Sequence, residues 1–242
     1  MSWPQTSLAI AYLASTLGTY LAITPPNPTP PPTSSSPSSK PAIKDSIHVI
    51  NFTHNHINKF VAAPILLISL HAAALAYSYP SIPPSILRHG AENGFNESLA
   101  TWSPSTAIPF ILLLFLGVPL RLVPFRSLGT NFTFALTRPS GLKTSGIYGY
   151  VQHPSYTGIV VVVLCNVWLY ARADGVVACW APPGWHSVMK AVEGPAMLVG
   201  AGAFLTGVGM RVIEEERMLR GEFGEKWERW HARTARFVPG VF

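Results

Sequence analysis

The chain has 242 residues, of which 48% are hydrophobic and only 12% are charged. Because a soluble domain carries charges on roughly a quarter of its residues, this composition excludes an ordinary soluble protein and favours an all-α integral membrane protein. The net charge of +6 does not indicate nucleic acid as a partner, because the basic residues cluster beside apolar segments, where anionic lipid headgroups can meet them.

The N-terminal residues 1–23 contain an apolar run from Gln5 to Ile23. They lack a basic start and lead into a proline run, so we expect a retained first transmembrane helix, with a cleaved signal peptide as the alternative. Residues 24–59 follow as a linker and juxtamembrane segment that is rich in proline and serine, a composition that cannot bury a core. The segment contains no cysteine, and we predict that its histidines His48, His54 and His56 are solvated interfacial residues and form no metal site.

Further apolar runs approach the roughly 20 residues that a spanning helix needs. The last two are short, and we expect them to extend into their flanks, for example into DGVVACW after Ala171. The sequence therefore predicts about five transmembrane helices, at Gln5–Ile23, Phe60–Tyr79, Ala107–Val123, Tyr156–Ala171 and Pro195–Met210.

The basic residues are distributed unevenly among the connecting segments. Residues 24–59, 121–152 and 211–242 carry 14 of the 17 lysines and arginines, and the other segments carry 3. With five spans these three segments share one side of the membrane, and the positive-inside rule makes that side the cytosol. Residues 60–123 are then two transmembrane helices joined by a lumenal loop, and residues 124–242 contain the polar chemistry, with a pocket that faces the cytosol.

The first polar stretch, GLKTSGIYGYVQHPSY, runs from Gly141 to Tyr156 and leads into the fourth apolar run. Its glycines permit tight turns and a close backbone approach to a ligand, and Pro154 is suited to the first turn of a helix. The alternative is a purely structural loop whose tyrosines, Tyr148 and Tyr156, belong to an interfacial aromatic belt.

The second polar stretch leaves the fifth apolar run at Arg211. Arg211 and Glu215 are four residues apart and so share one helix face, at the end of a span where ionisable groups are costly and usually functional. A stripe of Leu219, Phe223, Trp227 and Trp230 follows at helical spacing. We interpret it as the apolar face of a C-terminal amphipathic helix that lies in the membrane interface.

Together these stretches resemble the isoprenylcysteine carboxyl methyltransferase family of integral membrane enzymes. The resemblance rests on the pattern LxTSGxYxxxxHPSYxG from Leu142 to Gly158 and on RxxxEExxLxxxFGxxWxxW from Arg211 to Trp230. It implies S-adenosylmethionine as the cofactor and prenylated CaaX proteins as substrates. It also implies cofactor contacts at Thr137, Gly141, Leu142, Lys143, Tyr148, His153, Pro154, Ser155, Tyr156 and Glu215.

Arg211 inherits the catalytic and substrate-binding role in this resemblance, in which it holds the acceptor carboxylate. The chain departs from the family pattern at Gln152, where arginine is usual and where a fixed cation is therefore lost. It also has Trp227 and Trp230 in place of the usual tyrosines.

The resemblance implies methylation of the C-terminal prenylcysteine at the endoplasmic reticulum membrane, with the active site facing the cytosol. A methyltransferase for another lipid or small-molecule acceptor is the first alternative, and the change at Gln152 favours it. An inactive membrane scaffold with the same fold is the second alternative, and cofactor binding would distinguish it from the enzymes.

Overall fold

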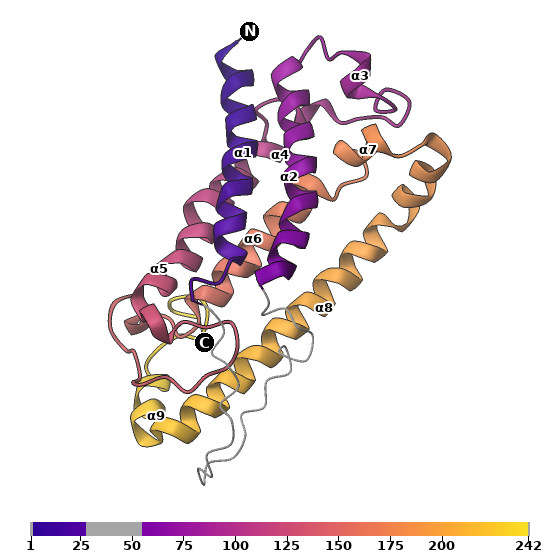
Figure 1. Cartoon of the computed structure of the whole chain (residues 1–242). Helices are drawn as coiled ribbons and strands as arrows, with labels where there is room; N and C mark the ends of the chain where they lie inside the picture. Colours follow the sequence, from indigo (N-terminus) through magenta and orange to yellow (C-terminus); the bar gives the residue numbers. More distant parts are fainter. Residues whose placement is uncertain (1, 28–54, 242) are drawn as a thin grey trace.

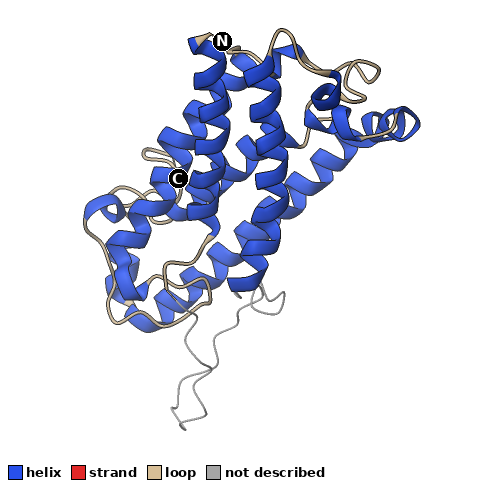
Figure 2. Ribbon diagram, turned by 45° about the horizontal axis from the view of Figure 1, so that its top comes forward, coloured by secondary structure: helices blue, strands red, loops and turns tan. Residues whose placement is uncertain are grey.

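The computed structural model describes residues 2–27 and 55–241, and side chains from residue 62 onward in the second part. Most of the predicted linker, including His48 and His54, lies outside these residues. The described parts are helical and contain no strand (Figure 2). The helices are α1 (Trp3–Ile23), α2 (Asn55–Ser78), α3 (Pro84–Leu87), η2 (Glu97–Leu99), α4 (Pro104–Ile111), η3 (Leu112–Gly117), α5 (Val118–Leu128), η4 (Gly129–Asn131), η5 (Gly146–Gly149), α6 (Pro154–Tyr170), α7 (Val176–Trp180), α8 (Pro183–Phe223) and α9 (Glu225–His231).

Helices occupy all five predicted positions. By length and apolar composition, three helical stretches are able to cross a membrane, namely Trp3–Ile23, Glu97–Asn131 and Pro183–Phe223. The apolar parts of the other two, Ala62–Ser78 and Pro154–Tyr170, are shorter. The expected extension after Ala171 is wrong, because α6 ends at Tyr170 and the DGVVACW segment forms a turn and the separate helix α7.

The helices α1, α2, α4 to α5 and α6 form a bundle, and α8 runs obliquely along it from α7 to α9 (Figure 1). With 41 residues α8 is about 60 Å long, which exceeds the roughly 30 Å of a bilayer's hydrocarbon core. Its buried residues lie toward its ends: His186 near α7, and Arg211, Val212 and Glu216 near α9. The middle of α8 therefore presents its apolar side chains outward, as a lipid-facing helix does.

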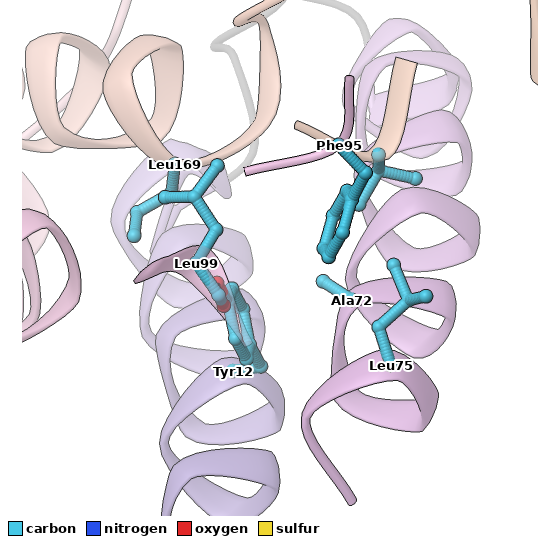
Figure 3. A pocket seen from close by; sticks show the side chains of 7 residues that line it. Tyr12, Ala72, Leu75, Phe95, Leu99 and Leu169 are labelled. Carbon is cyan, nitrogen blue, oxygen red and sulfur yellow. The ribbon is translucent and has the colours of Figure 1, made fainter. Parts of the chain in front are cut away.

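One end of the bundle, near the N-terminus, is a packed core built around Tyr12. Its hydroxyl donates to the carbonyl of Leu99 at 2.7 Å, and its ring meets Phe110 edge to face. The cavity beside Tyr12 and Leu169 in Figure 3 has a volume of only about 10 Å³, enough for one water at most. This end is structural, and the polar stretches lie at the opposite end (Figure 1).

The contact between α5 and α6 brings the two backbones unusually close. A Cβ added at Gly158 would lie 2.8 Å from the amide nitrogen of Arg121 and 2.9 Å from the carbonyl oxygen of Gly117. Since neither backbone atom can move independently of its helix, only glycine fits at this position. The close approach places Arg121 beside the first turn of α6.

Candidate functional site

The two polar stretches meet where α6 begins and α8 ends. Because Pro154 starts α6, Tyr156 lies in its first turn, and its hydroxyl donates to the Glu215 carboxylate at 2.7 Å. The same hydroxyl interacts with Arg211, which is only 5% exposed. Tyr156 therefore joins the two charged residues that the sequence places on one face of α8.

The loop after α5 covers this cluster. The carbonyl of Phe134 accepts a hydrogen bond from Arg211, and the loop is tied to α8 by Arg138, which lies 3.7 Å from Glu222. Thr137, a predicted cofactor contact, exchanges a 2.8 Å hydrogen bond with Thr133 inside this loop. The loop thus holds Arg211 in place, while the hydroxyl of Thr137 forms its hydrogen bond within the loop.

An aromatic cluster lies beneath the predicted cofactor loop. Tyr148, Trp227 and Trp230 are all buried, and Trp230 donates to the carbonyl of Tyr148 at 2.7 Å. The prediction that this stripe faces the membrane interface is wrong, because a turn at Gly224 (φ 52°) separates α9 from α8 and folds the tryptophans inward. The partly buried members of the cluster are Leu128, Leu142, Ile147, Leu219 and Phe223.

Of the loop residues predicted to contact the cofactor, Gly141 and Lys143 are exposed and Leu142 packs in the aromatic cluster. Burial raises the pKa of Tyr148, and the nearby Glu215 carboxylate raises it further. The Tyr148 phenol is therefore neutral at physiological pH and can donate a hydrogen bond.

His153 contacts Glu216, the residue that follows Glu215 in the sequence. Its Nε2 lies 3.3 Å from Glu216 Oε1, and the same oxygen lies 3.0 Å from Arg236 Nε. The histidine is 3% exposed. These contacts bind α6, α8 and the C-terminal segment together, so the imidazole's observed partners are structural ones.

The side chain of Gln152 bonds the C-terminal segment. Its Nε2 donates to the carbonyls of His231 and Thr234, and its Oε1 lies 2.7 Å from His231 Nδ1. The residue that replaces the usual arginine therefore anchors the chain after α9. The side-chain hydrogen bonds of Gln152 to described residues all go to this segment and not to Arg211 or Glu215.

Arg121 is a site residue that the sequence interpretation missed. It is 8% exposed, donates to the hydroxyl of Ser155, and lies within electrostatic range of Tyr148, Tyr156 and Glu215. The sequence does carry a signal for it, because Arg121 is a lone ionisable residue inside an apolar run, the same feature that indicates a role for Arg211.

An apolar groove of about 410 Å³ runs between α6 and α8. Glu193 is the only charged residue among those that line it. At the end of the groove nearest the site, Val163 follows Tyr156 by seven positions in α6. Phe204 precedes Arg211 by seven positions in α8. Seven positions correspond to about 10 Å along a helix. The groove therefore runs along the first half of α8 and ends about 10 Å from Tyr156 and Arg211.

Comparison with known proteins bears on this arrangement. Residues 110–182 match the model of the isoprenylcysteine carboxyl methyltransferase family, and a search of curated proteins gave no match. The matched segment contains Arg121, the predicted cofactor loop and the HPSY turn, whereas Arg211 and Glu215 lie beyond it. The match agrees with the resemblance of the sequence motifs to this family and supports a membrane methyltransferase.

Proposed function

We propose that the chain uses S-adenosylmethionine to methylate the C-terminal carboxylate of prenylcysteine in CaaX proteins, at the endoplasmic reticulum membrane. The observation that carries the proposal is the junction of Tyr156, Glu215 and Arg211, about 10 Å along the helices from the end of an apolar groove. A polar cluster of this kind suits a charged donor and a charged acceptor, and the groove suits the acceptor's isoprenoid chain.

The residues present fit S-adenosylmethionine, a molecule with a cationic sulfonium, an ammonium and a carboxylate. Glu215 supplies a negative charge, Arg121 supplies a buried positive charge, and the Tyr148 phenol supplies a neutral donor. The adjacent loop of Gly141 and Lys143 is exposed and accessible from water. Glu215 therefore suits a cationic group of the cofactor, and the Arg121 and Tyr148 donors suit its carboxylate.

When bound, S-adenosylmethionine supplies an activated methyl group that a carboxylate oxygen can accept directly, so the transfer needs no general base. The protein's task is then to orient the acceptor and to keep water out, effects that together lower a barrier by about 7 to 11 kcal/mol. Arg211 is suited to hold the acceptor carboxylate. Tyr156 fixes Glu215 by its 2.7 Å hydrogen bond, which keeps this carboxylate facing the cationic donor rather than the acceptor.

The membrane orientation follows the charge distribution. The segments that form the site, 121–152 and 211–242, belong to the side that holds 14 of the 17 basic residues, and the positive-inside rule favours the cytosol for that side. A water-soluble cofactor and the soluble part of a prenylated protein would both reach the site from there.

The test uses purified full-length protein in lipid nanodiscs with S-adenosylmethionine and N-acetyl-S-farnesylcysteine. Mass spectrometry should detect the methyl ester, and Arg211→Ala should lower its rate by at least 100-fold. The matched control is Glu225→Ala, which removes an exposed carboxylate of α9 and should leave the rate unchanged. No ester at saturating cofactor would refute the proposal, and methylation of phosphatidylethanolamine instead would favour the alternative lipid acceptor.

A further inference from the structure

Arg121 is a buried cation held by neutral groups. Its Nε donates to the carbonyl of Ala22 at 3.0 Å, at the last turn of α1, and its Nη1 donates to Ser155 at the start of α6. Both acceptors are uncharged. They fix the orientation of the guanidinium without neutralising it.

Aromatic rings surround the rest of the group. The Arg121 guanidinium carbon lies 5.0 Å from the ring centre of Phe125, 5.6 Å from that of Phe132 and 4.9 Å from that of Phe134. Such cation–π contacts favour the charged form but only partly replace the hydration that is lost on burial.

No carboxylate in the described part of the chain lies within ion-pair distance of Arg121. Glu215, the acid that acts on it electrostatically, is already hydrogen-bonded to Tyr156. A guanidinium has five N–H donors in a planar fork that fits a carboxylate. Within the described residues, the hydrogen bonds of Arg121 use Nε and Nη1, which leaves donors on Nη2 for another acceptor.

A buried charge without a counter-ion is costly, and in membrane proteins such residues mark ligand or ion sites. We propose that Arg121 binds a carboxylate of a molecule held in the site, as a second cation beside Arg211. Phe134 lies between the two arginines, with its ring at Arg121 and its carbonyl at Arg211, so the arginines define two separate anion positions.

This inference rests on the proposed function, in which each reactant carries one carboxylate. The acceptor has its terminal carboxylate, and the donor has the carboxylate of its methionine moiety. Two carboxylates and two buried arginines match in number. With Arg211 at the acceptor carboxylate, Arg121 is left for the carboxylate of the donor, and the reverse assignment is the other outcome of the test. The chemistry at Arg121 is the same for both sources, and binding measurements separate them.

The experiment compares wild type, Arg121→Gln and Arg121→Lys as full-length proteins in nanodiscs. Calorimetry measures the binding of S-adenosylhomocysteine and of methylthioadenosine, which has the same nucleoside and thioether but no amino-acid carboxylate. Activity assays measure the KM for N-acetyl-S-farnesylcysteine. Arg126→Gln is the matched control, because Arg126 is exposed on the same helix. Arg121→Lys keeps the positive charge and serves as the second variant if Arg121→Gln does not fold. It should show a smaller loss of ligand binding than Arg121→Gln.

If Arg121 holds the donor's carboxylate, Arg121→Gln should bind S-adenosylhomocysteine at least tenfold more weakly and methylthioadenosine equally well. If it holds the acceptor's carboxylate, S-adenosylhomocysteine binding should be unchanged and the KM for the acceptor should rise at least tenfold. Equal losses for both nucleosides would indicate a structural role and overturn the inference, as would unchanged binding and KM. A carboxylate-dependent loss in binding without any ester formation would refute the proposed acceptor and support the role of Arg121.

Discussion

Replacement of Gln152 by alanine tests how the C-terminal segment is held. The side chain is 4% exposed and bonds the carbonyls of His231 and Thr234 and the imidazole of His231. Each bond contributes about 1 kcal/mol, and a buried group left unsatisfied costs about 1 to 3 kcal/mol. With three groups affected and water able to enter the space left by the side chain, we expect the segment to be destabilised by about 2 to 4 kcal/mol.

Limited trypsin digestion measures this effect directly, because Arg233 and Arg236 are exposed cleavage sites within the anchored segment. If local opening is fast relative to cleavage, the cleavage rate follows the population of the open form. A change of 2 to 4 kcal/mol then corresponds to roughly 30-fold to 1000-fold faster cleavage after these arginines.

The matched control is Thr157→Val. It removes an exposed hydrogen bond of 3.1 Å from the Thr157 hydroxyl to the carbonyl of Phe237 and a longer one of 3.4 Å to the carbonyl of His153 at the start of α6. It should change the cleavage rate less than tenfold. Gln152→Arg restores the residue that is usual in the family. It should protect only partly, because arginine can donate to the two carbonyls but cannot accept from His231. Unchanged cleavage of Gln152→Ala would refute the anchoring role that we derive from these bonds.

Three further predictions concern packing, the site and pH. Gly158→Ala should lower the thermal unfolding temperature by several degrees and reduce expression, because its Cβ would lie 2.8 Å from the amide nitrogen of Arg121; a fall of less than 1 °C would contradict this clash. Tyr156→Phe should lower kcat/KM for the acceptor about tenfold to 100-fold, because it removes a hydrogen bond to the charged Glu215; an unchanged value would exclude a positioning role. Burial lowers the pKa of His231 below its ordinary value near 6.5, with the Glu216 charge opposing this shift and Arg236 reinforcing it. The unfolded state therefore binds more protons just below pH 6.5, so stability should be full above that pH and decline as the pH falls. Thermal unfolding at pH 7.5 and 5.5 should show this loss, and the loss should be smaller in His231→Asn; an equal loss in both proteins would contradict the assignment.

Prediction from the sequence succeeded where a property is local. Apolar runs located all five helical positions, and Pro154 correctly marked the start of α6. The four-residue spacing placed Arg211 and Glu215 on one face of α8, and the order of the apolar runs brought this face to the HPSY turn, where Tyr156 meets Glu215. These features depend on helix period and span length, which are readable from the chain.

The tryptophan stripe shows where such prediction stops. Helical spacing correctly grouped Leu219, Phe223, Trp227 and Trp230, but the same pattern suits a lipid-facing surface and a packed core equally well. The structure decides in favour of the core, because the turn at Gly224 directs α9 back over Tyr148.

The sequence by itself determined an all-helical membrane protein with its polar chemistry at one end of the bundle, because composition, helix period and charge distribution are properties of the chain alone. Only the tertiary structure decided which partner each polar side chain meets. Gln152 bonds residues about 80 positions away, and Arg121 bonds Ala22 at one end of α1 and Ser155 at the start of α6. Side chains that share a helix face can meet any neighbouring element, and the choice among those elements is made by the packing of the whole bundle.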